Sequence, residues 1–478
     1  MDLDLTSRPQ LPAADQKRAE HQALRSRLLS GLWSDDLEHA LDKHIKPERR
    51  AAWGIAEMSR NPFRSLSTQV GGALYSMPPI LRGPTGGEGL LATVQASGYF
   101  QLMQRVSTDL VGIREALVRV DWTERGGLLH RPIPGELCIV RSRSEAPDVP
   151  VAVEELQSRT NPKTGKPAWA WEVLDVDDLD NPVHVILSAD RKEDWTEATL
   201  KGLKSGANYQ YRDMAGKPYL PVGMYHAERT GNLWDSYYGV EAVLGTLTVG
   251  VLLTFWVHGV KDGSFATVLL VGGRIVGMEI TSPSGTKTQV ISTEPGSFIE
   301  VSPIEEGVQP SALQIQPGFD PEKLMGAISG FEQGLAEYAG VSAADLVRTG
   351  ADPRSGASLS ISREGLRASQ ARYEPQLRRG DLGILEISAK VLNGATSTKY
   401  PETGYSISYP SLPLSSGEVA AQTTDIVTKI AHGLMSKVDG YMRLHPGLSR
   451  EQAVLELQRI QRENLQFPGP APAPTFPS

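Results

Sequence analysis

The chain has 478 residues, of which 40% are hydrophobic and 22% are charged, and its formal net charge is −8. This length exceeds one ordinary compact core, so we expect two to four domains or one elongated body. The acidic balance excludes a protein that grips nucleic acid over its whole surface, because such surfaces carry excess basic residues. The single cysteine, Cys138, excludes a disulfide scaffold.

The N-terminal third is predicted to begin with a loose arm and continue as helices. The opening MDLDLTSRPQ has no basic region or apolar run, so no signal peptide is expected and the cytoplasm is the default compartment. Apolar residues then recur about every four positions, which predicts amphipathic helices between Gln16 and Met58. These residues are Leu24, Leu28, Leu32, Leu37, Leu41 and Ile45. A further helix is expected from about Leu90 to Arg105.

The next part, from about Ile113 to Pro221, has a mixed pattern. Short strands are predicted for ALVRVDW, ELCIVR, AWEVLDV and HVILSA, and a helix for KEDWTEATLKGLKSG. Turns are expected at TNPKTGKP and DLDNP between these strands. This alternation indicates an α+β layer, and no internal repeat is found.

An uncharged segment of 16 residues, AVLGTLTVGVLLTFWV, runs from Ala242 to Val257. It is shorter than the roughly 18 to 20 residues needed to cross hydrocarbon, which favours a helix buried inside the protein or between subunits over a membrane span. The following FATVLLVGGRIVGMEI predicts a hairpin over Gly272 and Gly273, with further strands up to Gly318.

A second helix has clear start signals. Asp320 is a natural N-cap, Pro321 suits the first helical position, and an apolar face recurs from Leu324 to Tyr338. A loop follows, and then a long helix from about Leu359 to Leu392, in which Pro375 predicts a kink or break. GYSISYPSLP is expected to form a strand.

The C-terminal region is predicted to be a small helical unit from about Ser416 to Leu465. Two capping-box patterns support it, Ser415 with Glu418 and Ser449 with Gln452. The last residues, FPGPAPAPTFPS, are too rich in proline and too poor in apolar surface to fold.

Arginines gather in one stretch, from Leu346 to Leu382. It holds seven arginines and four acidic residues, a local balance of +3, and no lysine. For the helical part, a solvated face with intersubunit ion pairs is as good an interpretation as a functional one. The loop of Gly, Ser, Asp and Arg favours a functional role, because an ordered domain rarely places such a loop between two long helices otherwise.

Known catalytic and metal-binding motifs are not found in the sequence. A phosphate-binding loop would need glycine where Thr160 stands, and neither a nucleophile elbow nor paired metal-ligating histidines occur. The acidic run EVLDVDDLDNP lacks the glycine and bidentate glutamate of a calcium loop, which favours a solvated turn over a metal site at Asp175 to Asp180. We therefore expect no catalytic residue, metal or cofactor.

Three segments resemble the portal proteins of tailed bacteriophages. HAERTGNLWDSYYGVEAV resembles the entry into the first stem helix of a portal, and EGVQPSALQIQPGFDPEKLM resembles the return into the second. YAGVSAADLVRTGADPRSGASLSISREGLR resembles the tunnel loop and the helix after it, although Ser342 and Ala343 stand where portals often have proline. The resemblance covers roughly residues 60 to 465 and rests on order and local pattern.

The resemblance implies an elongated α+β subunit with the following parts. They are a flexible arm (1–15), an α+β wing (16–235), a first stem helix (236–257), a β-rich clip (258–318), a second stem helix (319–340), a tunnel loop (341–358), a long kinked helix with a wing strand (359–415), a helical crown (416–466) and a Pro-rich tail (467–478).

The resemblance also implies a function and partners. Portals are structural rings of about twelve subunits at one capsid vertex of the virion, assembled in the bacterial cytoplasm, through which double-stranded DNA is packaged and ejected. The implied partners are other copies of the chain, DNA without sequence specificity, the terminase large subunit, a neck or adaptor protein, and the major capsid protein and scaffold, but no membrane.

Site residues are implied by position. The expected DNA-channel residues of the tunnel loop are Arg348, Thr349, Asp352, Arg354, Ser355 and Ser358; Arg363 and Arg367 are assigned to the channel or to intersubunit contacts. The expected oligomer-interface residues of the stem are Leu247, Val251, Leu252, Phe255, Trp256, Leu324, Ile328, Phe331 and Leu335.

Two other functions stay open from the sequence. One is a soluble multidomain enzyme with its site in residues 113–221, which would show a cleft of converging His, Asp or Glu side chains there. The other is a different head–tail adaptor or baseplate protein, although such proteins are usually shorter and lack the order of helix, β-rich insert and helix.

Overall fold

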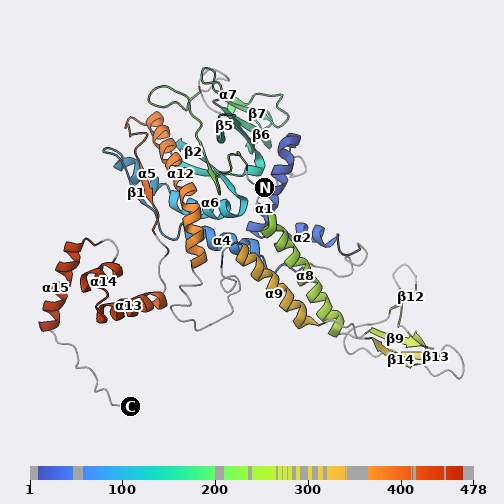
Figure 1. The fold of residues 1–478 in the computed structure, drawn as a ribbon. Helices are drawn as coiled ribbons and strands as arrows, with labels where there is room; N and C mark the ends of the chain where they lie inside the picture. The colour runs from blue at the N-terminus through green and yellow to red at the C-terminus, as the bar shows by residue number, and fades with distance from the viewer. Residues whose placement is uncertain are drawn as a thin grey trace, which may run out of the picture.

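A computed structural model describes most of the chain. The described residues are 9–46, 57–199, 209–234, 240–264, 267–271, 273–276, 278–281, 287–290, 300–303, 311–315, 320–339, 341, 364–410, 412, 416–445 and 448–466. Their side chains are described too, except those of 261–319, 416 and 464. The elements form an elongated α+β subunit, as the sequence predicts (Figure 1).

The N-terminal helices pack around the body of the subunit. They are α1 (Ala13–Ser30), α2 (Ser34–Leu41), α4 (Pro62–Leu74), α5 (Glu88–Ala96) and α6 (Tyr99–Ile113). The single helix expected from Leu90 to Arg105 is wrong, since Gly98 lies in the left-handed region at φ 76° and separates α5 from α6. Leu32 also departs from the predicted apolar face: α1 ends at Gly31, and Leu32 is 73% exposed.

Two antiparallel sheets form the β layer of the body. The first has the order β3 (Gly127–Ile133), β2 (Glu115–Thr123) and β8 (Val222–His226), and the second is a meander of β4 (Cys138–Arg143), β5 (Ala146–Thr160), β6 (Pro167–Asp175) and β7 (Val183–Ser188). The four predicted strands are thus present as β2, β4, β6 and β7, whereas β3, β5 and β8 were not predicted. The expected helix near residue 196 is short in the described residues, α7 (Thr196–Thr199).

The long helix α12 (Glu364–Ala395) crosses the first sheet. Two glycines allow the close approach: a Cβ on Gly223 of β8 would lie 2.4 Å from Ile384 Cδ1, and one on Gly380 would lie 2.2 Å from Tyr225 Cδ1. Of the kink or break predicted at Pro375, the break is not present, because helical structure continues through that residue. The short strand β15 (Ser406–Ser408) pairs with β1 (Ile80–Arg82).

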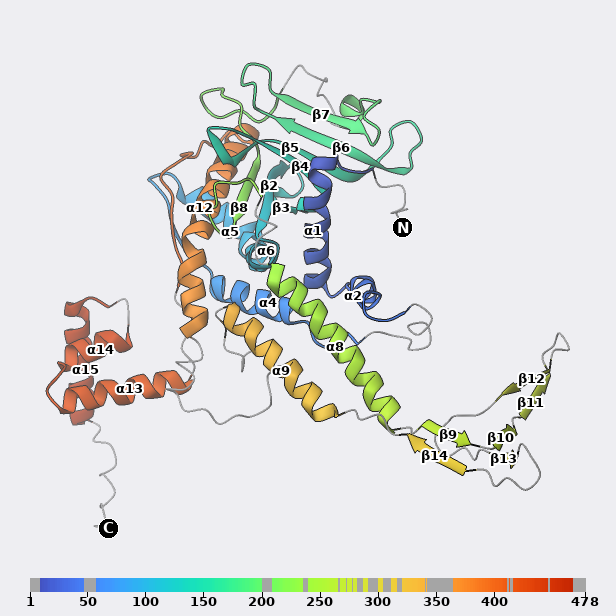
Figure 2. The ribbon, with the colours of Figure 1, turned by 45° about the vertical axis from the view of Figure 1, so that its right-hand side comes forward.

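Helices α8 (Val240–Ser264) and α9 (Pro321–Tyr338) leave the body side by side and antiparallel (Figures 1 and 2). Asp320 caps α9 as predicted, its carboxylate accepting from Lys323 N at 3.0 Å. Between them lies a two-stranded ribbon of β9 (Thr267–Val271), β10 (Gly273–Val276), β11 (Met278–Thr281), β12 (Lys287–Val290), β13 (Glu300–Pro303) and β14 (Ser311–Ile315).

The ribbon is built from nested pairs. β9 pairs with β14, β10 with β13 and β11 with β12, all antiparallel. The predicted hairpin over Gly272 and Gly273 is therefore wrong: β9 and β10 follow one another along the ribbon, and the chain returns through β13 and β14. Alternating apolar residues predict a strand correctly, but they do not determine its partner.

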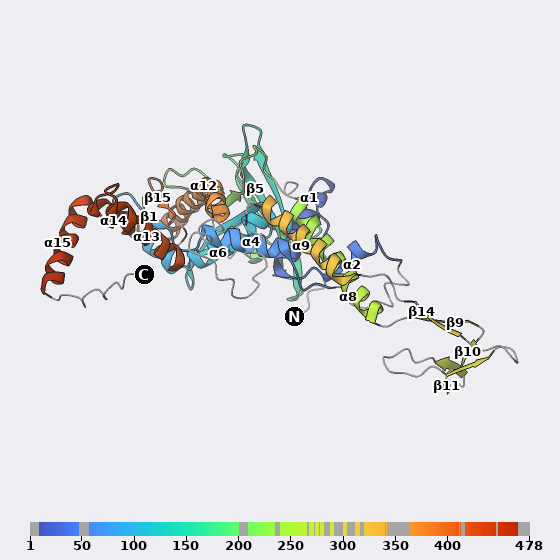
Figure 3. The same cartoon turned by 60° about the horizontal axis from the view of Figure 1, so that its bottom comes forward.

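Helices α13 (Ser416–Ala431), α14 (Lys437–Leu444) and α15 (Arg450–Gln466) lie apart from the body, at the end opposite to the ribbon in Figure 3. The capping box of α15 is confirmed, because Ser449 N donates to Gln452 Oε1 at 2.9 Å and Gln452 N donates to Ser449 Oγ at 3.2 Å. Ser415 lies outside the described residues.

Candidate assembly and DNA-contact surfaces

We refer to α8 and α9 together as the stem. α8 continues to Ser264, seven residues beyond the predicted end at Val257. The segment Val240–Val260 is long and apolar enough to cross a membrane by length and composition, so the length argument against a span was wrong. A core helix passes the same test, and 44% of its most apolar window is buried inside this chain.

One face of α8 packs on the N-terminal helices. Leu247, Val251 and Phe255 contact a cluster that contains Trp33 and Leu37. At Gly250 the helices are so close that a Cβ would lie 2.8 Å from Leu37 Cδ1. This face is therefore buried within the subunit.

Another face of α8 packs on α9. Leu252 and Trp256 border the main core, as does Leu324, while Ile328 and Leu335 are buried in it. The Trp256 indole donates to Pro321 O at 3.0 Å, and a Cβ on Gly245 would lie 2.5 Å from Leu335 Cδ2.

These contacts show that most of the predicted interface residues pack within their own subunit. Eight of the nine are buried or half-buried by the chain itself, so a neighbouring subunit is not needed to shield them. Phe331 differs, since it lies on the outer side of α9 and is 42% exposed. Their role in an interface between subunits stays a prediction.

The outer side of the stem carries exposed apolar and small residues. Besides Phe331, Leu244 is 59% exposed and Tyr338 is 61% exposed. Gly326, Gly330 and Gly334 repeat every four residues on α9, and a Cβ at any of them would meet no atom within 4 Å. This side of the stem has room for another helix to approach closely.

The predicted tunnel-loop residues lie outside the described residues. They are Arg348, Thr349, Asp352, Arg354, Ser355 and Ser358, and Arg363 lies outside as well. Their assignment to a DNA channel stays a prediction.

The arginines of α12 have partners in the same chain. Arg367 Nη2 lies 2.5 Å from Glu418 Oε1 on α13, Arg379 Nη1 lies 2.9 Å from Asp148 Oδ2, and Arg378 pairs with Glu374 one turn away. Arg372 pairs with Glu228. Each of these arginines therefore has an acidic partner within the subunit, and a further contact of Arg367 with DNA or another subunit stays a prediction.

Arginine side chains and backbone amides contact the acidic run at the end of β6. Arg141 and Arg143 lie 2.8 Å from carboxylate oxygens of Asp175 and Asp177. Asp178 accepts from the Asn181 side chain at 3.0 Å, and hydrogen bonds from Asn181 and Asp180 hold its pKa below the usual range. Among the residues that the structure describes, no group of three His, Cys, Asp or Glu residues could hold a metal ion.

Charged side chains do converge in the 113–221 region, but they are buried. Glu172 accepts from Arg119 at 2.8 Å, Arg159 at 2.6 Å and His184 Nε2 at 3.0 Å. Burial opposes the charge, yet Arg119 and the other donors hold the pKa of Glu172 well below its usual value. Glu172 and His184 are almost fully enclosed, so this is an internal ion-pair network and not the open cleft that an enzyme would need.

Comparisons with known proteins show only distant similarity. No family model and no curated protein matches the chain. Solved structures that it resembles include the neck of an empty gene transfer agent particle, with a TM-score of 0.40, 10% identity and coverage of 80% of this chain and 90% of that chain. A native gene transfer agent virion gives a TM-score of 0.42 at 10% identity, covering 80% of this chain and 89% of that one. An HK97 family phage portal protein from Corynebacterium diphtheriae gives a TM-score of 0.31 at 12% identity, covering 74% and 93%.

Proposed function

We propose that this chain is the subunit of a portal-type ring, a structural conduit for double-stranded DNA at a capsid vertex and not an enzyme. The observation that carries the proposal is the stem: two antiparallel helices that leave an α+β body and are joined at their far end by a strand ribbon. The arginine-rich stretch from Leu346 to Leu382 comes shortly after the second stem helix in the sequence and extends into α12, the helix that crosses the body.

The exposed side of the stem supports self-assembly. Exposed Phe331, Leu244 and Tyr338 add apolar area that water solvates poorly, and the open glycines of α9 remove the side chains that would keep another helix away. Glycine inside a helix costs roughly 0.5 to 1 kcal/mol relative to alanine, and nothing within the described part of the subunit offsets that cost at Gly326, Gly330 and Gly334. Burial against another copy would offset it.

The partners of such a ring are proposed with it. The ribbon at the far end of the stem would meet the packaging motor and later the neck protein, and the body would face the capsid protein and scaffold. With the arginine-rich segment inside the ring, contacts to DNA would be made to phosphates and would not depend on sequence.

The test is the mass and shape of the purified full-length chain. Twelve subunits of 51.8 kDa give a particle of about 620 kDa with a central hole, measurable by light scattering and negative-stain imaging. Gly330→Trp should abolish the large particle but keep the subunit folded. The indole would block the approach of another helix, whereas a Cβ at this position has no atom of its own subunit within 4 Å.

A matched control is Gly394→Trp, at an exposed helical glycine of α12 that also has open space around it. It should assemble like the unchanged protein. A sharp 51.8 kDa monomer at every concentration of the unchanged protein would refute the ring.

A further inference from the structure

The segment 227–234 follows β8 and leads towards α8, and it has no regular secondary structure. We refer to it as the strap. Its middle residues, 229–232, are exposed, whereas Ala227 at its start is buried. The strap runs from the first sheet towards the stem, so its contacts belong to the joint between the body and the stem.

Both ends of the strap are held by groups inside the body. Ala227 N donates to Arg114 O at 2.8 Å. At the other end, the Arg18 guanidinium lies 4.1 Å from the centre of the Trp234 ring, and Arg18 is itself buried and donates to Cys138 O at 2.6 Å. Salt screens buried contacts much less than exposed ones, so these two ends are held at any ordinary ionic strength.

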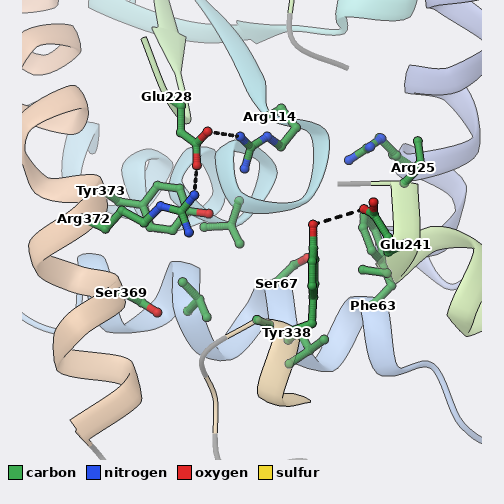
Figure 4. A pocket seen from close by; sticks show the side chains of 16 residues that line it. Arg25, Phe63, Ser67, Arg114, Glu228, Glu241, Tyr338, Ser369, Arg372 and Tyr373 are labelled. Carbon is green, nitrogen blue, oxygen red and sulfur yellow. Dashed lines mark hydrogen bonds and ion pairs between the residues drawn. The ribbon is translucent and has the colours of Figure 1, made fainter. Parts of the chain in front are cut away.

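The middle of the strap meets α12 at Glu228. Arg372 of α12 pairs with one carboxylate oxygen of Glu228, and Arg114 Nη2 lies 3.2 Å from the other oxygen (Figure 4). The Arg372 side chain reaches from α12 across to the strap and is 63% exposed. Water and salt therefore have access to the contact between Glu228 and α12.

A second group of ion pairs involves the next strap residue. Arg229 Nε lies 3.2 Å from Asp148 Oδ2, and Arg379 Nη1 of α12 lies 2.9 Å from the same oxygen. The hydrogen bond from Arg379 lowers the pKa of Asp148, so this carboxylate is charged at neutral pH. Here one carboxylate of β5 joins the strap to α12, and the Arg379 side chain is 46% exposed.

The two α12 arginines match the strap in position and charge. Arg372 and Arg379 lie about two turns apart on the same side of α12, opposite two consecutive strap residues of opposite charge. An exposed ion pair changes an equilibrium by roughly fivefold at most, and it weakens as the Debye length falls from about 10 Å at 0.1 M salt to about 3 Å at 1 M. The strap is therefore held firmly at its ends, but weakly and in a salt-dependent way at its middle.

We propose that residues 227–234 act as a salt-sensitive strap, which is closed on α12 at low ionic strength and opens when the ion pairs of Arg372 and Arg379 are screened. Opening is local, because the ends at Ala227 and Trp234 stay in place while the sheets and the stem helices stay folded. The closed strap couples α12 to the approach to the stem, and the open strap does not. The inference concerns the subunit alone and does not require a ring.

The experiment is limited proteolysis of the full-length protein with trypsin, which cleaves after Arg229 when the strap is open. Each rate is divided by the rate of cleavage after Lys192, an exposed residue outside the strap, so that effects of salt on the protease cancel. For the unchanged protein, this ratio should rise about tenfold between about 20 mM and about 500 mM NaCl, because cleavage follows the population of the open form.

The variant Arg372→Ala with Arg379→Ala should already be cleaved about tenfold faster at low salt, and its rate should depend much less on salt. The matched control, Arg105→Ala with Arg378→Ala, also removes two arginines. Arg105 lies on α6 and Arg378 pairs with Glu374 of its own helix, so neither contacts the strap. This control should be cleaved like the unchanged protein at every salt concentration.

Hydrogen exchange of the strap amides, measured by mass spectrometry, is the second readout. It should quicken in Arg372→Ala with Arg379→Ala, while the thermal midpoint stays close to that of the unchanged protein. Cleavage after Arg229 that does not depend on salt in the unchanged protein, or equal cleavage rates in the two double variants, would overturn the proposal. A large fall in the thermal midpoint of the first variant would also overturn it, because the ion pairs would then hold the whole body together.

Discussion

At the scale of single residues, the centre of the body is a buried carboxylate surrounded by tyrosines. Asp381 accepts hydrogen bonds from Tyr99 at 2.6 Å, from Tyr225 at 2.8 Å, and from Tyr75 and Tyr409. Burial raises the pKa of Asp381, and the four hydroxyl donors oppose that rise. The four tyrosines come from the C-terminal end of α4, from α6, from β8 and from the segment after β15. One carboxylate therefore joins four distant parts of the chain to α12.

His130 is a second, partly buried polar link, and it makes stability depend on pH. Its ring nitrogens lie 3.1 Å from Ser97 Oγ and 3.0 Å from Ser388 Oγ, and burial lowers its pKa to about 4. In the unfolded chain the pKa is about 6.5, so between these values the unfolded state binds more protons. The stabilising effect is present above pH 6.5 and is lost as pH falls towards 4.

We predict that His130 contributes about 2 kcal/mol to this loss, allowing for its partial exposure. Urea unfolding between pH 7 and pH 4.5 measures it. His130→Gln should be less stable at pH 7 and should show a shallower fall in the free energy of unfolding. An equal fall in both proteins would mean that His130 is not the titrating group.

At the scale of elements, the packing of helix pairs depends on small residues at particular positions. In α4, Gly71 faces α6, where a Cβ would lie 2.5 Å from Thr108 Cα, and the Gly71 carbonyl accepts from Ser107 Oγ at 2.9 Å. The next residue, Gly72, is exposed, and a Cβ there would meet nothing within 4 Å. The two neighbours in one helix therefore have opposite environments.

This difference gives a matched pair of variants. Gly71→Ala should lower stability by about 2 kcal/mol, since the added methyl group meets backbone that cannot move aside without separating α4 from α6. Gly72→Ala should be neutral or stabilising by up to about 1 kcal/mol, because alanine is the better helix former. Thermal midpoints compare the two, and equal shifts would show that α6 yields at this contact.

At the scale of the whole molecule, charge is distributed unevenly. The chain carries −8 overall, yet its arginine-rich stretch from Leu346 to Leu382 is basic. Within that stretch the described arginines of α12 pair with acids of the same chain, including Glu418 and Asp148. Because the α12 arginines already have acidic partners, we propose DNA contacts only for the arginines before α12. Two of these, Arg348 and Arg354, lie in the predicted tunnel loop.

We predict that the double variant Arg348→Ala, Arg354→Ala weakens binding of unrelated duplex DNA and keeps the particle mass. Each lost phosphate contact should reduce the salt dependence, the slope of log affinity against log salt, by about 0.9. Fluorescence anisotropy at several salt concentrations measures that slope. The control, Arg378→Ala with Arg379→Ala, removes arginines that are already paired and should leave the slope unchanged. Loss of the particle in the loop variant would place those arginines in an interface between subunits instead.

Local structure follows from the sequence wherever the signal lies within a few residues. The cap of α9 at Asp320, the capping box of α15 and the strands β2, β4, β6 and β7 follow from side chains that act on their own backbone or alternate between two faces. The sequence also predicts the order of helix, β-rich insert and helix, because helices and strands differ in the periodicity of their apolar residues.

Which surfaces meet depends on tertiary packing, and the sequence does not show it. Apolar spacing marks the faces of α8 as buried, but it cannot say that α2 and α9 cover them, and it cannot pair β9 with β14 across the whole ribbon. The tyrosines around Asp381 come from segments far apart in the chain, with no local spacing to connect them. Such sites arise because packing brings distant side chains into one low-dielectric space, where charge and hydrogen bonding must be balanced.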